Sequence, residues 1–134
     1  MALALVLTAA LTAPLKTSTA EAAVADDLLA KYKASGAKGF DAGRGGEMWG
    51  KESKEGKSSQ PRSCVTCHTK DLKQAGKHAE TGETIKPLAP SANPERLTDA
   101  KFIEKWFNRN CKWTYGRECT SQEKGDFLMF IRSR

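Results

Sequence analysis

The stretch Cys64-Val65-Thr66-Cys67-His68 places two thiols three positions apart and a histidine directly after the second thiol. One helical turn brings two such sulfurs to the separation of the two vinyl groups of a porphyrin, to which each thiol can add. His68 then projects beneath the porphyrin iron and can supply its proximal nitrogen. The motif therefore predicts one covalent haem c, bound by Cys64 and Cys67, with its iron ligated by His68.

Paired cysteines also occur in two other kinds of site, and the sequence suits neither of them well. A thioredoxin-type redox pair belongs to a βαβ unit, a pattern that this sequence lacks. A zinc site needs a second ligand pair with short spacing, whereas the remaining cysteines, Cys111 and Cys119, are eight residues apart. The pattern favours covalent haem over both alternatives.

The N-terminal residues have features of a secretory signal. Residues 1–15 are apolar and rich in alanine and leucine, and Ala20-Glu21-Ala22 has the form of an A-x-A cleavage site. The basic residues that normally precede the apolar run are missing, and an uncleaved anchor is the alternative, although the run is short and interrupted for a membrane span. We expect a signal peptide at residues 1–22, export to the bacterial periplasm, and no membrane span after cleavage.

The rest of the chain, residues 24–134, is predicted to be one all-α haem domain of four to five short helices. Apolar periodicity and capping residues place helix starts near Val24, Asp41, Cys64, Thr98 and Ser121. We expect the third helix to reach Gln74 and the fourth to end at Asn110. Gly45 and Trp49, one turn apart, should let the last helix cross closely. A chain of about 110 residues has a thin core, which a central haem would enlarge.

The helix expected over residues 98–110 carries an apolar stripe formed by Ile103, Trp106 and Phe107. Asn110 falls on the same face, seven residues after Ile103 and four after Trp106. We expect this stripe to face the haem and to bring one neutral amide toward it. The residues alone leave two roles open for Asn110, a ligand of the iron and the C-cap of the helix.

Ordinary class I cytochromes c bring a methionine to the iron from a loop well after the haem motif, but no methionine lies between His68 and the last helix. Met48 precedes the motif, and Met129 lies among aromatic residues of the last helix, where a core position explains it better. His78 lies in a polar segment and fits a surface position better than an iron-ligating one. The remaining candidates for the sixth ligand are Asn110, His78, a lysine, water or none.

Cys111 and Cys119 remain once the haem has used the other two cysteines. Two spare cysteines at this spacing in an exported protein are expected to form a disulfide, with free thiols as the alternative. The ring is so short that the bond would add only about 2.5 kcal/mol of stability. Its position matters more, because it would fix the loop that directly follows Asn110.

Several short segments carry a joint pattern across residues 24–132. The segments are 64–68, 81–90, 96–99, 104–106, 109–111 and 116–120. Together they resemble the SHP cytochromes, which are small oxygen-binding monohaem cytochromes c. The resemblance implies a class I cytochrome c-like fold and a redox partner, commonly a dihaem cytochrome c with a membrane cytochrome b.

In the SHP cytochromes an asparagine directly before the first disulfide cysteine is the distal iron ligand, and the related cytochrome c″ carries a histidine there. The resemblance therefore implies that Asn110 is the ligand in this chain and that Cys111 pairs with Cys119. The chain departs from the family in one longer loop and in three bulky residues, which bear on access to the distal pocket. These departures are residues 51–63, Lys112, Trp113 and Tyr115.

A neutral amide is a weak and fairly hard donor that suits ferric iron better than ferrous iron. Reduction should therefore loosen the Asn110 bond and open a position for O2, NO or CO under Ile103, Trp106 and Phe107. The predicted function is a periplasmic electron acceptor with His68 and Asn110 as axial ligands. The alternatives are an electron carrier with permanent six-coordination and a haem reductase of oxygen, peroxide or nitrogen oxides, for which no acid–base pair is evident.

The formal net charge of +6 comes from lysines and arginines that are scattered between acidic residues. Nucleic-acid binding requires basic residues clustered on one face or in one run, and the composition therefore argues against it. We expect a solvated surface that can meet an acidic partner protein.

Overall fold

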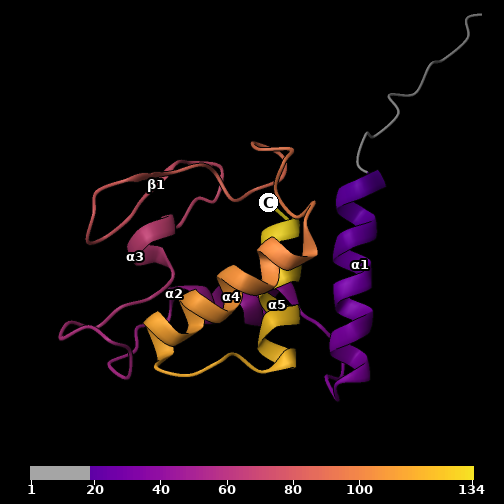
Figure 1. Ribbon diagram of the computed structural model, residues 1–134, viewed down its shortest axis with the longest axis horizontal. Coiled ribbons are helices and arrows are strands. Elements are labelled where there is room, and N and C mark those ends of the chain that lie inside the picture. Colours follow the sequence, from indigo (N-terminus) through magenta and orange to yellow (C-terminus); the bar gives the residue numbers. More distant parts are fainter. Residues whose placement is uncertain (1–18) are drawn as a thin grey trace, which may run out of the picture.

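The computed structural model describes residues 19–134, which form five helices and one small hairpin (Figure 1). The elements are α1 Thr19–Ala34, α2 Ala42–Gly50, α3 Val65–His68, β1 Gly76–Lys77, β2 Thr84–Ile85, α4 Ala100–Tyr115 and α5 Ser121–Arg132. The two strands pair antiparallel, two residues each, and were not expected from the sequence. The prediction of an all-α fold is confirmed. Most of the predicted signal peptide lies outside the described residues, and its cleavage remains a prediction.

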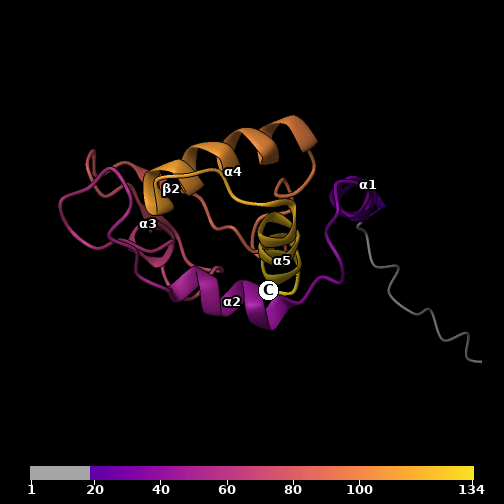
Figure 2. The same ribbon diagram turned by 90° about the horizontal axis from the view of Figure 1, so that it is seen from below.

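The fold is arranged around α5, whose Phe127 and Leu128 are among the largest fully buried side chains of the described chain. Figure 2 shows α2 and α4 on opposite sides of α5, with α3 at the end of the molecule away from α1. The buried side of α1 carries Leu28 and Tyr32, which belong to the same core. This arrangement places the Cys64–His68 motif between the elements that carry Trp49 and Asn110.

The crossing of α2 over α5 is close because Gly45 has no side chain. A Cβ atom at Gly45 would collide with the backbone carbonyl of Asp126 and lie 2.9 Å from the Cβ of Phe130. One turn later, the Trp49 ring packs against Phe127 and Phe130, with centroid distances of 6.0 and 5.7 Å. The predicted close crossing at Gly45 and Trp49 is confirmed.

Gly45→Ala should lower the free energy of unfolding by about 2 kcal/mol or more, because the two helices must separate to admit a methyl group. Gly50 lies in the same helix, and a Cβ atom there meets nothing within 4 Å. Gly50→Ala should therefore be neutral or slightly stabilising. Urea unfolding of both holoproteins, followed by circular dichroism, measures the difference. Equal stabilities of the two variants would contradict the close crossing.

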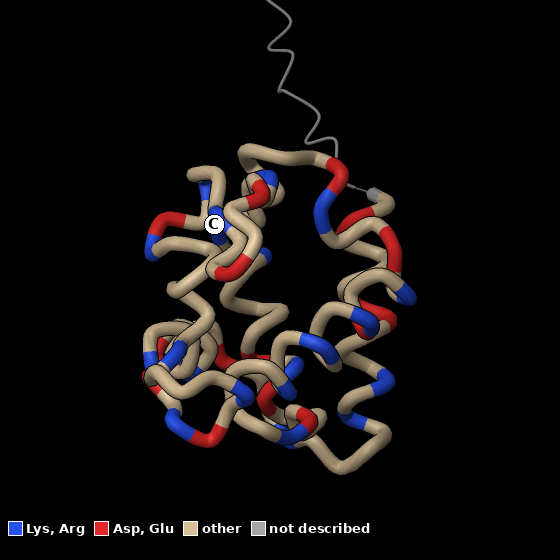
Figure 3. The backbone as a smooth tube through the Cα atoms, turned by 60° about the vertical axis from the view of Figure 1, so that its left-hand side comes forward, with Lys and Arg blue, Asp and Glu red and all other residues tan. Residues whose placement is uncertain are grey.

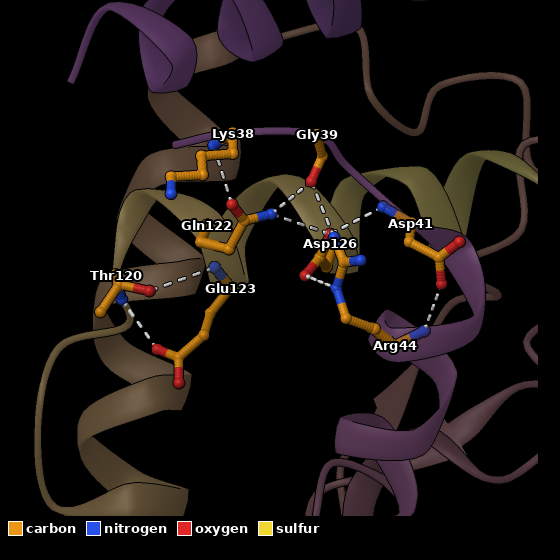
Figure 4. A network of polar contacts seen from close by, with 8 residues as sticks. All are labelled: Lys38, Gly39, Asp41, Arg44, Thr120, Gln122, Glu123 and Asp126. Atoms are coloured by element: carbon orange, nitrogen blue, oxygen red, sulfur yellow. Dashed lines mark hydrogen bonds and ion pairs between the residues drawn. The ribbon is translucent and has the colours of Figure 1, made fainter. Parts of the chain in front are cut away.

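A buried carboxylate ties the start of α2 to α5 (Figure 4). The Asp126 side chain, 3% exposed, accepts hydrogen bonds from the Asp41 backbone N–H at 2.7 Å and from the Arg44 guanidinium at 2.8 and 2.9 Å. Gln122 adds a longer contact of 3.3 Å to the same carboxylate. A buried charge is costly unless it is paired and hydrogen-bonded, and Asp126 is both. The network therefore fixes the orientation of α2, which carries Trp49 to the haem motif.

The first helix begins at Thr19, earlier than the predicted start near Val24, and the C-terminal ends of two other helices also differ from the predicted ones. The helix of the haem motif ends at His68 instead of Gln74, because Thr69 takes a left-handed φ of 64°. The chain then folds back, and a Cβ atom at Gly76 would collide with the Cys67 carbonyl. The fourth helix continues five residues past Asn110 to Tyr115. Its stop signal is Gly116, whose φ of 70° is the left-handed conformation that favours glycine.

Candidate haem site

The Cys64–His68 motif forms a single helical turn, in which the His68 backbone N–H donates to the Cys64 carbonyl at 3.0 Å. Both thiols are free and half-buried. Trp49 of α2 packs against this turn, since its indole N–H donates to the Thr69 carbonyl at 3.4 Å and its ring centroid lies 5.5 Å from that of His68. The turn therefore has the short helical geometry that two-point attachment of a porphyrin requires.

His68 is held as a neutral imidazole. Burial, and next the positive charge of Arg96, lowers the pKa of His68 to about 4. Its Nδ1 atom is buried and has no hydrogen-bond partner among the described residues. Neutral imidazole is the form that ligates a metal, and a buried nitrogen without a partner is costly in a protein without a bound group. The environment of His68 therefore fits the proximal ligand of a haem.

Arg96 was not expected to take part in the site. Its guanidinium donates to the carbonyls of Pro87 at 2.9 Å and Lys86 at 2.8 Å. It thereby fastens the proline-rich segment, in which the backbone N–H groups of Leu88 and Ala89 donate to the carbonyl of Leu72, shortly after α3. The sequence contains only a weak signal for this role of Arg96. Prolines have no backbone N–H groups, so a segment with two prolines forms little regular structure, and its carbonyls remain available to a nearby arginine.

The residues of the predicted apolar stripe on α4 lie in two different environments. Ile103 is buried, and Phe107 stacks on Phe127 of α5 with a centroid distance of 6.2 Å. Trp106 is 37% exposed and lies beside Phe102, which is 46% exposed; these are the exposed large apolar side chains of the described residues. Two exposed large apolar side chains on one helix indicate a surface that a bound apolar group can cover. Ile103 and Phe107 thus join the core, whereas Trp106 does not.

Asn110 lies within α4 and is half-buried. Because Gly116 caps this helix, the alternative role of Asn110 as C-cap is wrong. The Asn110 amide makes no hydrogen bond to any residue from 19 to 134. An amide that is partly enclosed and unengaged is available to a ligand-binding site at this position.

A disulfide joins Cys111 to Cys119, with a Cα–Cα distance of 5.6 Å. Both cysteines are buried. The bond links α4, just before its last turn, to the segment that leads into α5, where Thr120 and Glu123 form a capping box (Figure 4). It directly follows Asn110 and restricts how far that part of the helix can move.

The other candidates for the sixth ligand lie in different environments. The Nδ1 atom of His78 accepts hydrogen bonds from the backbone N–H groups of Glu80 at 3.3 Å and Thr81 at 3.2 Å, which commits this ring to the turn of the hairpin. Met48 is half-buried and packs against the core. Met129 is half-buried on α5 and lies outside the core cluster, contrary to expectation. The side chain of Asn110, unlike that of His78, makes no hydrogen bond to a described residue.

Comparison with known proteins identifies the family. A family model described as a domain of unknown function, DUF1924, matches residues 35–131. The cytochrome c-type protein SHP of Cereibacter sphaeroides is 43% identical over 107 residues, which span 80% of this chain and 81% of that protein. The chain belongs to the SHP family of c-type cytochromes. As a member, it is a monohaem cytochrome that carries covalent haem c, and the prediction of this family is confirmed.

Solved structures of SHP and cytochrome c″ share the fold. Oxidised SHP, an oxygen-binding cytochrome c, superposes with a TM-score of 0.76 at 42% identity and covers 82% of this chain and 96% of its own. Oxidised cytochrome c″ from Methylophilus methylotrophus gives a TM-score of 0.70 at 26% identity, covering 84% of this chain and 95% of its own. In sequence, that cytochrome c″ is 35% identical over 74 residues, spanning 55% of this chain and 51% of the relative.

The surface of this SHP-family chain mixes the two signs of charge. Figure 3 shows Lys and Arg interspersed with Asp and Glu along the described chain. Several are paired, such as Lys124 with Glu104 at 2.8 Å and Lys112 with Glu118 at 2.9 Å. This pattern is typical of a solvated surface. Among residues 19–134, no helix has the length and apolar character needed to cross a membrane.

Proposed function

We propose that this chain is an exported electron acceptor whose Asn110 ligand leaves the iron on reduction, so that O2 or another diatomic molecule can bind. The observation that carries the proposal is the state of Asn110: half-buried in α4, beside the disulfide, with an amide that no described residue engages. The oxygen binding of the related SHP, at 42% identity, supports it.

In this proposal Cys64 and Cys67 hold the haem through two thioether bonds, and His68 supplies the proximal nitrogen. The haem, when bound, supplies an iron that carries one electron and accepts a small axial ligand. His68 is suited to its role because its low pKa keeps the imidazole neutral throughout the physiological range. Trp49 contacts the turn that carries His68, and Arg96 holds the proline-rich segment at Pro87 in place.

Asn110 is proposed to close the distal side in the oxidised protein. An amide oxygen is a hard, neutral donor, which binds ferric iron more strongly than ferrous iron. With haem bound, gain of an electron would therefore weaken the bond to Asn110, whose side chain could turn away without breaking a hydrogen bond to the described residues. The exposed rings of Phe102 and Trp106 on the same helix keep this side apolar, which favours a neutral diatomic ligand.

Absorption and resonance Raman spectra of the purified holoprotein test the proposal. The oxidised protein should be six-coordinate, and addition of dithionite should give five-coordinate high-spin ferrous haem that binds CO at once. Reduced protein that stays six-coordinate and ignores CO would instead indicate an electron carrier with two permanent axial ligands. That result would end the proposal.

Export and the electron donor are also part of the proposal. The apolar N-terminal run and the cleavage-site pattern support a periplasmic protein, the compartment in which disulfides persist. The resemblance to SHP cytochromes suggests a dihaem cytochrome c and a membrane cytochrome b as the donor system. The net charge of +6 would steer the chain toward an acidic surface on such a partner.

A further inference from the structure

One hydroxyl group connects the distal helix with the haem-binding motif. Tyr115 is the last residue of α4 and is 9% exposed. Its hydroxyl donates to the Met48 carbonyl at 2.9 Å and lies 4.0 Å from the Cys64 sulfur. The Tyr115 hydroxyl therefore fastens the end of α4 to the end of α2. The sulfur of Cys64, the first haem cysteine, lies beside this connection.

The single hydroxyl proton of Tyr115 determines which hydrogen bond makes this connection. Burial raises the pKa of Tyr115, so the phenol stays neutral and keeps its single proton for donation. A free Cys64 thiol can donate to the phenol oxygen, whereas a thioether sulfur has no proton and can only accept. In the haem-bearing protein, the short contact with the Met48 carbonyl therefore remains the hydrogen bond that anchors Tyr115.

The loop from Ser53 to Arg62 encloses the same turn of α4 from another side. The Arg62 guanidinium lies 3.8 Å from the centre of the Trp113 ring. A Cβ atom at Gly56 would collide with the Trp113 carbonyl, and one at Gly116 would collide with the carbonyl of Glu55. The last turn of α4 therefore has little room to move while these contacts and the Tyr115 hydrogen bond hold.

We infer that Tyr115 is a positioning residue: its hydroxyl holds the end of α4 against the haem-attachment segment and so favours the state in which Asn110 is bound to the iron. The inference rests on the proposed function of Asn110. The two residues are five positions apart in one helix, which moves as a unit over so short a distance. Loss of the Tyr115 hydrogen bond should therefore make detachment of Asn110 easier in the oxidised protein.

Tyr115→Phe tests the inference in the oxidised holoprotein, where azide must displace Asn110 to bind. The variant loses one hydrogen bond that stabilises the Asn110-bound state, with which azide competes. Azide binding should therefore tighten about fivefold. A fivefold weakening of the Asn110-bound state, if it affects the ferric protein alone, corresponds to a rise of about 40 mV in the reduction potential, at 59 mV for each tenfold change. Tyr32→Phe removes the same atom from a buried tyrosine of α1 and should change neither quantity.

Asn110→Ala and the double variant with Tyr115→Phe separate this inference from the proposed function. If Asn110→Ala leaves the oxidised spectrum unchanged, the proposed ligand is wrong. If that spectrum changes but Tyr115→Phe alone leaves azide binding as in the wild type, only the positioning role of Tyr115 fails. The role also fails if the effect of Tyr115→Phe persists in the Asn110→Ala background.

A second variant keeps the test independent of how well Tyr115→Phe folds. Arg62→Met removes the guanidinium above Trp113 and retains a long side chain, and it should also tighten azide binding, because it frees the same turn of α4. If Tyr115→Phe does not fold, an azide affinity left unchanged by Arg62→Met would overturn the inference.

Discussion

Replacing Asn110 with histidine should keep the iron six-coordinate in both oxidation states and weaken CO binding to the reduced protein about 100-fold. Imidazole is a stronger ligand of ferrous iron than a neutral amide. Each additional ~1.4 kcal/mol of binding free energy of the distal ligand lowers the apparent affinity for CO tenfold. The position can accept the change, because Asn110 is only half-buried and its side chain takes part in no hydrogen bond with the described residues. The measurement is a CO titration of the dithionite-reduced variant.

Asn108→His is the matched control for this variant. Asn108 lies in the same helix, two residues earlier, and is exposed. A histidine there should leave the spectra and the CO affinity as in the wild type, because the new ring is in solvent. If both variants bind CO like the wild type, Asn110 does not lie within reach of the iron, and the distal ligand must be sought elsewhere.

Replacing Cys64 and Cys67 together with alanine should convert a protein whose haem resists acidic acetone into one that releases all of its pigment. Thioether bonds survive extraction, whereas an axial bond from His68 alone does not when acid protonates the imidazole. We expect the stability of the variant to fall as well, because the haem would no longer be a permanent part of a thin core. The pyridine haemochrome of pellet and extract measures the partition.

Cys111→Ala with Cys119→Ala provides the control, since it removes the same number of sulfur atoms. That variant loses the disulfide and should be less stable, but its haem should stay with the protein in acidic acetone. Retention of haem in the variant that lacks Cys64 and Cys67 would show that attachment does not depend on the motif.

Much of the fold was predictable because its signals are local. Helix periodicity, the Thr120–Glu123 capping box and the small residue at Gly45 each specify structure through neighbours in sequence or through one close approach. The end of the haem-motif helix was not predictable in this way. It depends on Thr69 adopting a left-handed φ while the chain folds back over the Cys67 carbonyl, which is a tertiary contact.

The covalent haem c was predictable from the sequence, and family membership confirms it, whereas the geometry around the motif was less predictable. The spacing of the motif indicated the haem cysteines and His68, but periodicity alone could not tell which residues of the α4 stripe face α5. Packing of Phe107 on Phe127 turns the helix so that Trp106 is left exposed. The hydrogen bond from Tyr115 to Met48 joins residues 67 positions apart, and no local pattern marks it.

The separation of the two cysteine pairs has a consequence for how the protein matures. If the chain is exported, as proposed, its four thiols meet an oxidising compartment, and two of them must stay reduced until the porphyrin arrives. Cys111 is eight residues from Cys119 but at least 44 from either haem cysteine, so ring closure with Cys119 is entropically favoured on the order of tenfold. Oxidation should therefore favour the Cys111–Cys119 bond over any bond between the two pairs, whereas Cys64 and Cys67 are only three residues apart and must be kept reduced by other means until the porphyrin arrives.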